Sequence, residues 1–174
     1  MATGIQICGL NGSGKSTLGK ALAEALRFHF IDNEDLFFVR TSANEPYANP
    51  RTRDEVIRLL MEKVHEYPDF VFAAVRGDYG ADIIQHYSFV IVVETPKDIR
   101  AQRVRSRSFE KFGARMQPGG DLYESEEAFF RMAAQRDESH IENWLKTLSC
   151  PIIRVNGTKP VAENIEFILQ KLCL

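Results

Sequence analysis

Short apolar segments alternate with longer amphipathic segments along the whole chain. The apolar segments are rich in β-branched and aromatic residues and predict strands at Ile5 to Cys8, Phe28 to Ile31, Phe70 to Val75, Phe89 to Val93 and Ile152 to Val155. The amphipathic segments predict helices at Lys15 to Leu26, Arg53 to Glu66, Pro96 to Arg107, Glu126 to Leu148 and Val161 to Leu172. Because parallel strands need crossover connections, the alternation predicts a three-layer α/β/α fold with a five-stranded parallel sheet.

Two stretches interrupt this pattern and predict irregular excursions. Ser42 to Thr52, within residues 40–54, holds two prolines and little apolar content. Arg105 to Ser125 mixes basic residues with Pro118 and a pair of glycines. Between them, Thr95 and Pro96 suit an N-cap and the first position of the following helix.

Length, composition and charge exclude several classes of protein. The 174 residues, 44% hydrophobic and 26% charged, fit a single globular domain. Twenty-two Lys and Arg against twenty-four Asp and Glu give a net charge of -2, which argues against a nucleic-acid-coating protein. No apolar run reaches the roughly 20 residues of a membrane span, so we expect a cytoplasmic chain without a membrane partner. Cys8, Cys150 and Cys173 are too scattered for a disulfide framework or a metal site and are expected to be reduced.

The strongest chemical signal lies between the first predicted strand and helix, where residues 9–17 fit the phosphate-binding pattern G-x-x-x-x-G-K-S/T. Glycines in such a loop let backbone N–H groups turn toward phosphate oxygens, and the helix N-terminus adds partial positive charge. Lys15 would then bridge the β- and γ-phosphates, and the Ser16 hydroxyl would bind Mg²⁺. The nucleotide-binding candidates are Gly9, Asn11, Gly12, Ser13, Gly14, Lys15, Ser16 and Thr17.

A phosphate loop defines a nucleoside triphosphate site without defining the task. The chain lacks the N-K-x-D guanine motif, which disfavours a GTPase switch. Arg76-Gly77-Asp78 stands after the third strand instead of an acidic pair, which weakens the case for an AAA-type ATPase. The small-kinase class remains.

A group of carboxylates follows the second predicted strand, in Asp32-Asn33-Glu34-Asp35-Leu36. Ligands of open parallel sheets bind at the carboxyl ends of the strands, so these acids are expected beside the phosphate loop. One of them would take the acceptor's proton and another would hold Mg²⁺ through water, with Glu34 the first choice of base and Asp32 the second. The alternative is a solvated acidic turn, or an N-cap for a short helix through Leu36 to Val39.

Arg100, Arg103 and Arg107 recur at helical spacing and lead into the second excursion. Arginines brought by a closing loop stabilise the charge that phosphoryl transfer spreads over equatorial oxygens. A solvated basic face is the alternative. Secondary candidates in the same region are Lys111, Arg115, Arg131 and Arg136.

These motifs, in this order, resemble the nucleoside monophosphate kinase-like group of P-loop kinases. The acidic segment resembles the D-x-D and D-x-D-x-L patterns of shikimate and gluconate kinases, with Glu34 in place of the second Asp. The strand, the proline-led helix and the R-x-x-x-R pair of Arg103 and Arg107 resemble the segment that leads into the lid of those kinases. The resemblance implies ATP as donor, Mg²⁺, and a lid near residues 105–125.

The segment Val155 to Glu163 is similar to the terminal strand, loop and helix of bacterial adenylate kinases. The resemblance implies that backbone groups of Gly157, Thr158 and Lys159 recognise adenine. A plain turn before a proline-led helix is the alternative.

We therefore predict a P-loop kinase that transfers the γ-phosphate of Mg·ATP to a small-molecule or nucleotide acceptor. The acceptor side is expected to draw on polar residues after the second and third strands, namely Asp32, Glu34, Asp35, Arg40, Arg76 and Asp78. A nucleotide-binding regulatory module or partner-dependent ATPase is the rival from another class, and a toxin-like or resistance kinase is a second. The sequence fixes neither the acceptor nor the oligomeric state.

Overall fold

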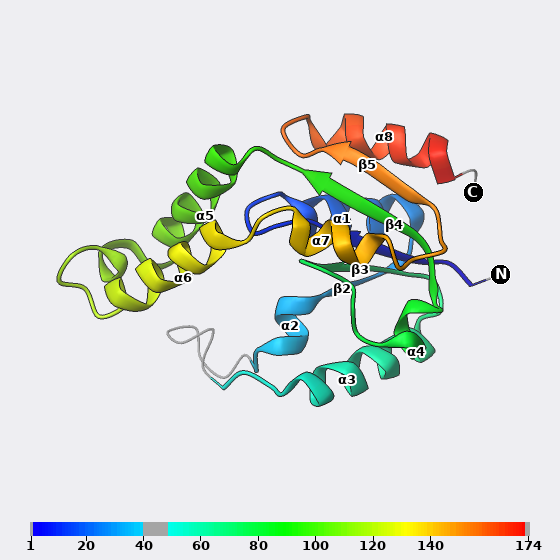
Figure 1. The fold of residues 1–174 in the computed structure, drawn as a ribbon, viewed down its shortest axis with the longest axis horizontal. Helices are drawn as coiled ribbons and strands as arrows, with labels where there is room; N and C mark the ends of the chain where they lie inside the picture. The colour runs from blue at the N-terminus through cyan, green and yellow to red at the C-terminus, as the bar shows by residue number, and fades with distance from the viewer. Residues whose placement is uncertain (1, 40–48, 173–174) are drawn as a thin grey trace.

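A computed structural model describes residues 2–39 and 49–172. Its centre is a five-stranded sheet with the order β2-β3-β1-β4-β5, in which all pairs are parallel (Figure 1). The strands are β1 (Gly4–Cys8), β2 (His29–Asp32), β3 (Phe70–Ala74), β4 (Tyr87–Glu94) and β5 (Ile152–Asn156). The predicted α/β fold is confirmed, with strand ends displaced by only one or two residues.

The principal helices lie where the amphipathic segments place them. The helices of the described residues are α1 (Lys15–Leu26), α2 (Asn33–Phe37), α3 (Arg53–Glu66), α4 (Ala81–Ile84), α5 (Lys97–Phe112), α6 (Tyr123–Gln135), α7 (Ser139–Leu145) and α8 (Val161–Leu172), with a 3-10 turn η1 (Gly113–Met116). The bounds of α1, α3 and α8 are those predicted. The short helices α2 and α4 carry too few residues to show a helical period.

Alternating residues of the strands supply two apolar layers. Ile5 and Ile7 of β1 pack with Leu22 of α1 and Ile168 of α8 on one face of the sheet. On the other face, Phe72 of β3 packs in a cluster that also draws on α3, α4 and α7. Each fully buried side chain of this size contributes about 1.5–3 kcal/mol, so both faces of the sheet are firmly covered.

The predicted helix Glu126 to Leu148 is wrong, because it is two helices. Arg136 ends α6 in an extended conformation (φ -70°, ψ 121°). Asp137 then accepts hydrogen bonds from the backbone N–H and the hydroxyl of Ser139, which starts α7 in a new direction. Aspartate and serine compete for backbone groups in this way, and the apolar stripe continued across the break and concealed it.

The segment Arg105 to Ser125 is more regular than predicted. Helix α5 continues to Phe112 instead of ending at Arg107, and together with η1 and α6 it forms the α5–α6 hairpin (residues 97–135), which projects from one end of the sheet (Figure 1). Val104, Met116 and Phe130 form a small apolar cluster inside the hairpin. This cluster stabilises the parts of the hairpin that the sequence did not predict as helical, residues 108–116 and 123–125.

Helix α5 also starts one residue later than predicted. Pro96 is its N-cap, with φ -52° and ψ 144°, and no side chain caps it. The Thr95 hydroxyl instead donates to the carbonyl oxygen of Ser13 at 3.1 Å. Contact with the phosphate loop therefore replaces the predicted capping role of Thr95.

Most of the excursion predicted at Ser42 to Thr52 lies outside the described residues. Its described end joins α3 through a capping box, in which Thr52 and Glu55 bind each other's backbone N–H groups. No helix of the described residues is long and apolar enough to cross a membrane. Cys8 and Cys150 are free thiols, and burial raises the pKa of Cys8 to about 12, which makes its thiol inert. Cys173 lies outside the described residues.

Candidate active site

The loop between β1 and α1 has the geometry of an anion cradle. Gly12 and Gly14 lie at φ 82° and 95°, a left-handed region that L residues with side chains rarely adopt. Within the described residues, the N–H groups of Gly12, Gly14, Lys15 and Ser16 form no backbone or side-chain hydrogen bond. They stand at the positive end of α1, where a phosphate would find unused donors.

Close packing holds the phosphate loop in this shape. A side chain at Gly12 would clash with the carbonyl oxygen of Arg100 on α5. Gly157, after β5, is as tightly placed, because a methyl group there would clash with the Thr95 hydroxyl and lie 2.5 Å from the Ser13 carbonyl oxygen. The loop is therefore braced by segments that lie some ninety and more residues further along the chain.

Lys15 stands at the start of α1 in a partly buried position. Burial lowers its pKa from 10.5 to about 8, while Asp32 and Glu34 raise it and Arg107 lowers it. The ammonium group therefore shares one electrostatic environment with the acidic segment and with α5. At neutral pH it remains mostly protonated and able to bind phosphate.

The acidic segment is positioned by the beginning of α2. Asp32 is the N-cap of α2 and accepts a hydrogen bond of 2.9 Å from the backbone N–H of Glu34. Asn33 accepts a hydrogen bond of 2.5 Å from the Tyr79 hydroxyl, which fixes the segment to the loop after β3. The capping alternative is thus confirmed for Asp32, although the helix begins at Asn33 and not near Leu36. Glu34 keeps an exposed side chain.

A single cavity of about 690 Å³ brings many of the predicted residues together. From the phosphate loop, Asn11, Lys15 and Ser16 line it, and from the acidic segment, Asp32 and Glu34. Opposite them stand residues of the α5–α6 hairpin. The cavity therefore combines phosphate-binding donors with carboxylates in a space large enough for a small molecule.

Arginines of the hairpin take different roles. Arg107 and the secondary candidates Lys111 and Arg136 line the cavity. Arg103 does not, since its guanidinium donates to the carbonyl oxygens of Gly157 at 3.0 Å and Ser13 at 3.4 Å. Arg100 is buried and donates to the Thr95 carbonyl oxygen at 3.0 Å. Of the remaining candidates, Arg115 pairs with Asp121 within the hairpin, and Arg131 is exposed.

The loop after β5 uses most of its own polar groups. The N–H of Gly157 bonds to Glu94, that of Thr158 to the Asn156 side chain, and that of Lys159 to the Asn156 carbonyl oxygen. The backbone N–H groups of all three residues are therefore already bonded within the protein.

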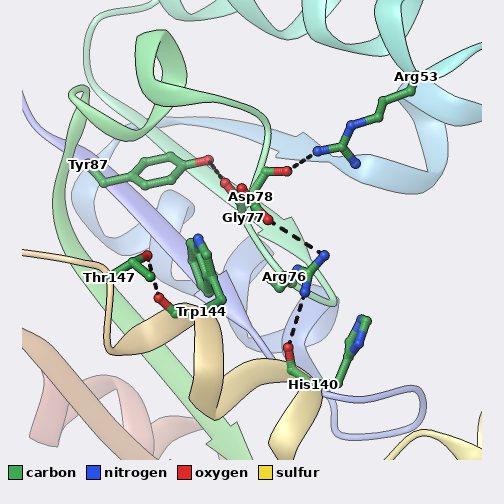
Figure 2. A network of polar contacts seen from close by, with 8 residues as sticks. All are labelled: Arg53, Arg76, Gly77, Asp78, Tyr87, His140, Trp144 and Thr147. Carbon is green, nitrogen blue, oxygen red and sulfur yellow. Dashed lines mark hydrogen bonds and ion pairs between the residues drawn. The ribbon is translucent and has the colours of Figure 1, made fainter.

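Arg76 and Asp78 lie away from the cavity, in a network around the end of β3 (Figure 2). Their side chains pair at 3.6 Å, and Arg76 also donates to the His140 carbonyl oxygen at 3.4 Å. Arg53 donates to the backbone carbonyl of Asp78. Arg76 and Asp78 therefore form an ion pair and do not line the cavity, contrary to their predicted place on the acceptor side. Asp35 also stays off the cavity lining, and Arg40 lies outside the described residues.

The apolar part of the cavity was not foreseen from the sequence. It is built from aromatic and aliphatic side chains of α2, its flank and the hairpin: Phe37, Phe38, Phe112, Leu122, Phe129 and Met132. The buried Glu126 of α6 lies among them. The pair Phe37-Phe38, directly after the acidic segment, was a sequence signal for an apolar part of the site. The hairpin residues carried no sequence signal that marked them as cavity residues.

The side-chain oxygens near the N-terminus of α1 suit Mg²⁺ as ligands. Ser16, Asp32 and Glu34 offer one hydroxyl and two carboxylates on one cavity. The described residues contain no group of three or more His, Cys, Asp or Glu arranged for a metal ion. Magnesium at a nucleotide site keeps several waters and phosphate ligands and needs only one or two protein oxygens, so the residues present fit it.

Comparisons with known proteins agree with this architecture. A family described as an AAA domain matches residues 5–128, and the chain belongs to that family. YqaC of Bacillus subtilis, an uncharacterized protein, is 26% identical over 180 residues, with 99% of this chain and 98% of YqaC covered. A cytidylate kinase of Haloarcula marismortui is 29% identical over 119 residues, covering 62% of this chain and 60% of the relative.

Two solved structures share the fold. A gluconokinase from Sinorhizobium meliloti 1021 matches with a TM-score of 0.59 and 18% identity. The match covers 99% of this chain and 92% of the gluconokinase chain. A sugar kinase from Janibacter sp. HTCC2649 has a TM-score of 0.57 and 17% identity, covering 99% of this chain and 95% of its own. The predicted likeness to P-loop kinases of the nucleoside monophosphate kinase-like group is confirmed.

Proposed function

We propose that the protein is an ATP-dependent kinase that transfers the γ-phosphate of Mg·ATP to a hydroxyl or phosphate group of a small molecule or nucleotide. The observation that carries this proposal is the common cavity of Lys15, the acidic segment and Arg107. A phosphate-binding lysine, a proton acceptor and a charge-stabilising arginine are the groups that such a transfer needs in one place. The cytidylate kinase relative supports the same reaction class.

The roles follow from the positions of the residues. The free N–H groups of the phosphate loop hold the β- and γ-phosphates, and Lys15 neutralises the charge that develops during transfer. Glu34, or Asp32 in its place, accepts the proton of the acceptor as its oxygen bonds to the γ-phosphorus and the bond to the β-phosphate oxygen breaks. The Ser16 hydroxyl would hold Mg²⁺, which would supply positive charge to neutralise the phosphates. Arg107 lies opposite and stabilises the equatorial oxygens.

The α5–α6 hairpin serves as the lid of this site. Its residues form the wall of the cavity opposite the phosphate loop, so movement of the hairpin would open the cavity to solvent and close it over bound ligands. Closure would exclude water, which otherwise competes with the acceptor for the γ-phosphate. Arg103 assists from the base of the hairpin, because it joins the phosphate loop to the Gly157 loop rather than contacting the acceptor.

Release of ADP from Mg·ATP tests the proposal across nucleoside monophosphates, nucleosides, shikimate, gluconate and aminoglycosides. We expect one class of acceptor to accelerate release in the wild type and none to do so in Lys15→Ala. Nucleotide binding with no response to any acceptor would favour the regulatory module or partner-dependent ATPase instead.

A further inference from the structure

Glu126 is a buried acidic residue without a protein partner. Its side chain lies on the cavity wall, and the residue is only 7% exposed. Within residues 2–39 and 49–172, its carboxylate forms no hydrogen bond or ion pair. The neighbouring Glu127 behaves differently, because it pairs with Arg105 at 2.8 Å.

The position of Glu126 on α6 is one that packing would fill with an apolar residue. Phe130 and Ala133 follow it at helical spacing and are buried on the same side of α6. The carboxylate oxygens themselves are open to the cavity, so a bound molecule can reach them. A bound molecule that donates a hydrogen bond would give this carboxylate a partner that the described residues do not supply.

The surroundings of Glu126 indicate what kind of molecule this is. Phe112 of α5 and Phe129 of α6 stand on the same cavity wall, and Phe37 lines the cavity from the end of α2. Aromatic walls favour a planar ring, which stacks on them and buries its faces. An acyclic sugar acid has no planar ring to stack on these walls.

We propose that Glu126 binds the phosphoryl acceptor, and that the acceptor carries an aromatic ring with an N–H or O–H donor directed at this carboxylate. The inference rests on the proposed function in treating the bound molecule as the phosphoryl acceptor. Binding of such a molecule at Glu126 does not itself require phosphate transfer. It separates this protein from the sugar-acid chemistry named by its gluconokinase structural neighbour.

Cytidine and gluconate are suitable probes, the first with a ring and donors and the second with a carboxylate and no ring. Calorimetric titration into the wild type, Glu126→Gln, Glu126→Ala and Glu124→Gln, with excess Mg·ADP in the nucleotide site, measures each affinity. Glu124 is the matched control, since it is exposed on the same turn of α6. We expect cytidine to bind the wild type and Glu124→Gln alike and Glu126→Ala roughly 10- to 100-fold more weakly, which corresponds to the loss of a charged hydrogen bond.

Thermal unfolding gives an independent readout. With Mg·ADP present, cytidine should raise the Tm of the wild type and of Glu124→Gln, and should raise the Tm of Glu126→Ala less. The inference is overturned if cytidine stabilises Glu126→Ala as much as the wild type, if gluconate binds the wild type more tightly than cytidine, or if cytidine fails to bind or binds the Glu126 variants unchanged. Cytidine binding without phosphate transfer to any compound would contradict the proposed function alone, whereas transfer that is indifferent to Glu126 would contradict this inference alone.

Discussion

The guanidinium of Arg136 donates a hydrogen bond of 3.0 Å to the side-chain oxygen of Asn11. Asn11 belongs to the phosphate loop, and Arg136 lies at the end of α6. This contact joins the far helix of the α5–α6 hairpin to the nucleotide end of the cavity. The break between α6 and α7 is what brings Arg136 to this position.

Removing this contact should loosen the hairpin over the site. We expect Arg136→Ala to lower kcat/KM by roughly ten- to a hundredfold, since a hydrogen bond to a charged group is lost. Steady-state kinetics for both substrates measures the effect. Arg131→Ala is the matched control, because Arg131 is an exposed arginine of the same helix; an equal loss in both variants would show that general charge is responsible.

Lys15→Ala should abolish turnover and weaken ATP binding while leaving the fold intact. The ammonium group lies on the cavity and is the only lysine of the phosphate loop. Turnover and nucleotide titration measure the two effects separately. Lys20→Ala, on an exposed turn of α1, should leave both unchanged; full activity in Lys15→Ala would contradict the assignment of the site.

The two leading carboxylates should separate in their effects. Glu34→Gln should spare ligand binding and lower kcat by roughly two to four orders of magnitude if Glu34 is the base. Asp32→Ala should lower the free energy of unfolding by about 1 kcal/mol, because the N-cap of α2 is lost, whereas Asp32→Asn should retain it. Kinetics and urea unfolding provide the measurements. Equal activity of Glu34→Gln and the wild type would transfer the role of base to Asp32.

Binding of Mg·ATP should take up protons at alkaline pH. Lys15 in the free protein has a pKa of about 8, below its ordinary value of 10.5, so it is largely neutral between these values. Phosphate favours the charged form and draws a proton onto Lys15 in that window, but not at pH 6.5, where the lysine is already protonated. Calorimetry in buffers of different ionisation enthalpy counts the protons. Uptake that persists in Lys15→Ala would assign it to another group.

The lowered pKa of Lys15 also makes the free energy of unfolding depend on pH. Between pH 8 and 10.5 the unfolded chain holds a proton that Lys15 has lost in the folded state. Stability therefore gains from this group as pH rises through that window, and the cost of burying Lys15 is fully present below it. Urea unfolding of the wild type and Lys15→Ala should converge toward pH 10.5 and differ most below pH 8.

The sequence predicted those features that are contiguous along the chain. The phosphate loop needs its glycines, lysine and serine side by side, and the bounds of α1 and α3 follow from local periodicity and caps. Features that depend on distant contacts were missed. Arg103 was expected at the transferred phosphate, yet it joins Ser13 to Gly157, two segments that only the folded sheet brings together.

The cavity illustrates the same limit. Glu126 was predicted only as the first residue of the late helix, because nothing in its local sequence shows that the hairpin folds over the phosphate loop. The predicted irregular segment after Arg105 hid this arrangement. Asp137 and Ser139, which break the late helix, were a local signal from which the separation of α6 and α7 could have been predicted.

The fate of the γ-phosphate tests the central claim most directly. ATP labelled in its γ-phosphate, incubated with the protein, Mg²⁺ and the acceptor panel, delivers the label either to an organic molecule or to water. We predict a labelled phosphate ester or anhydride of one acceptor with the wild type and none with Lys15→Ala. Label found entirely as inorganic phosphate, whichever acceptor is present, would contradict a kinase and indicate an ATPase.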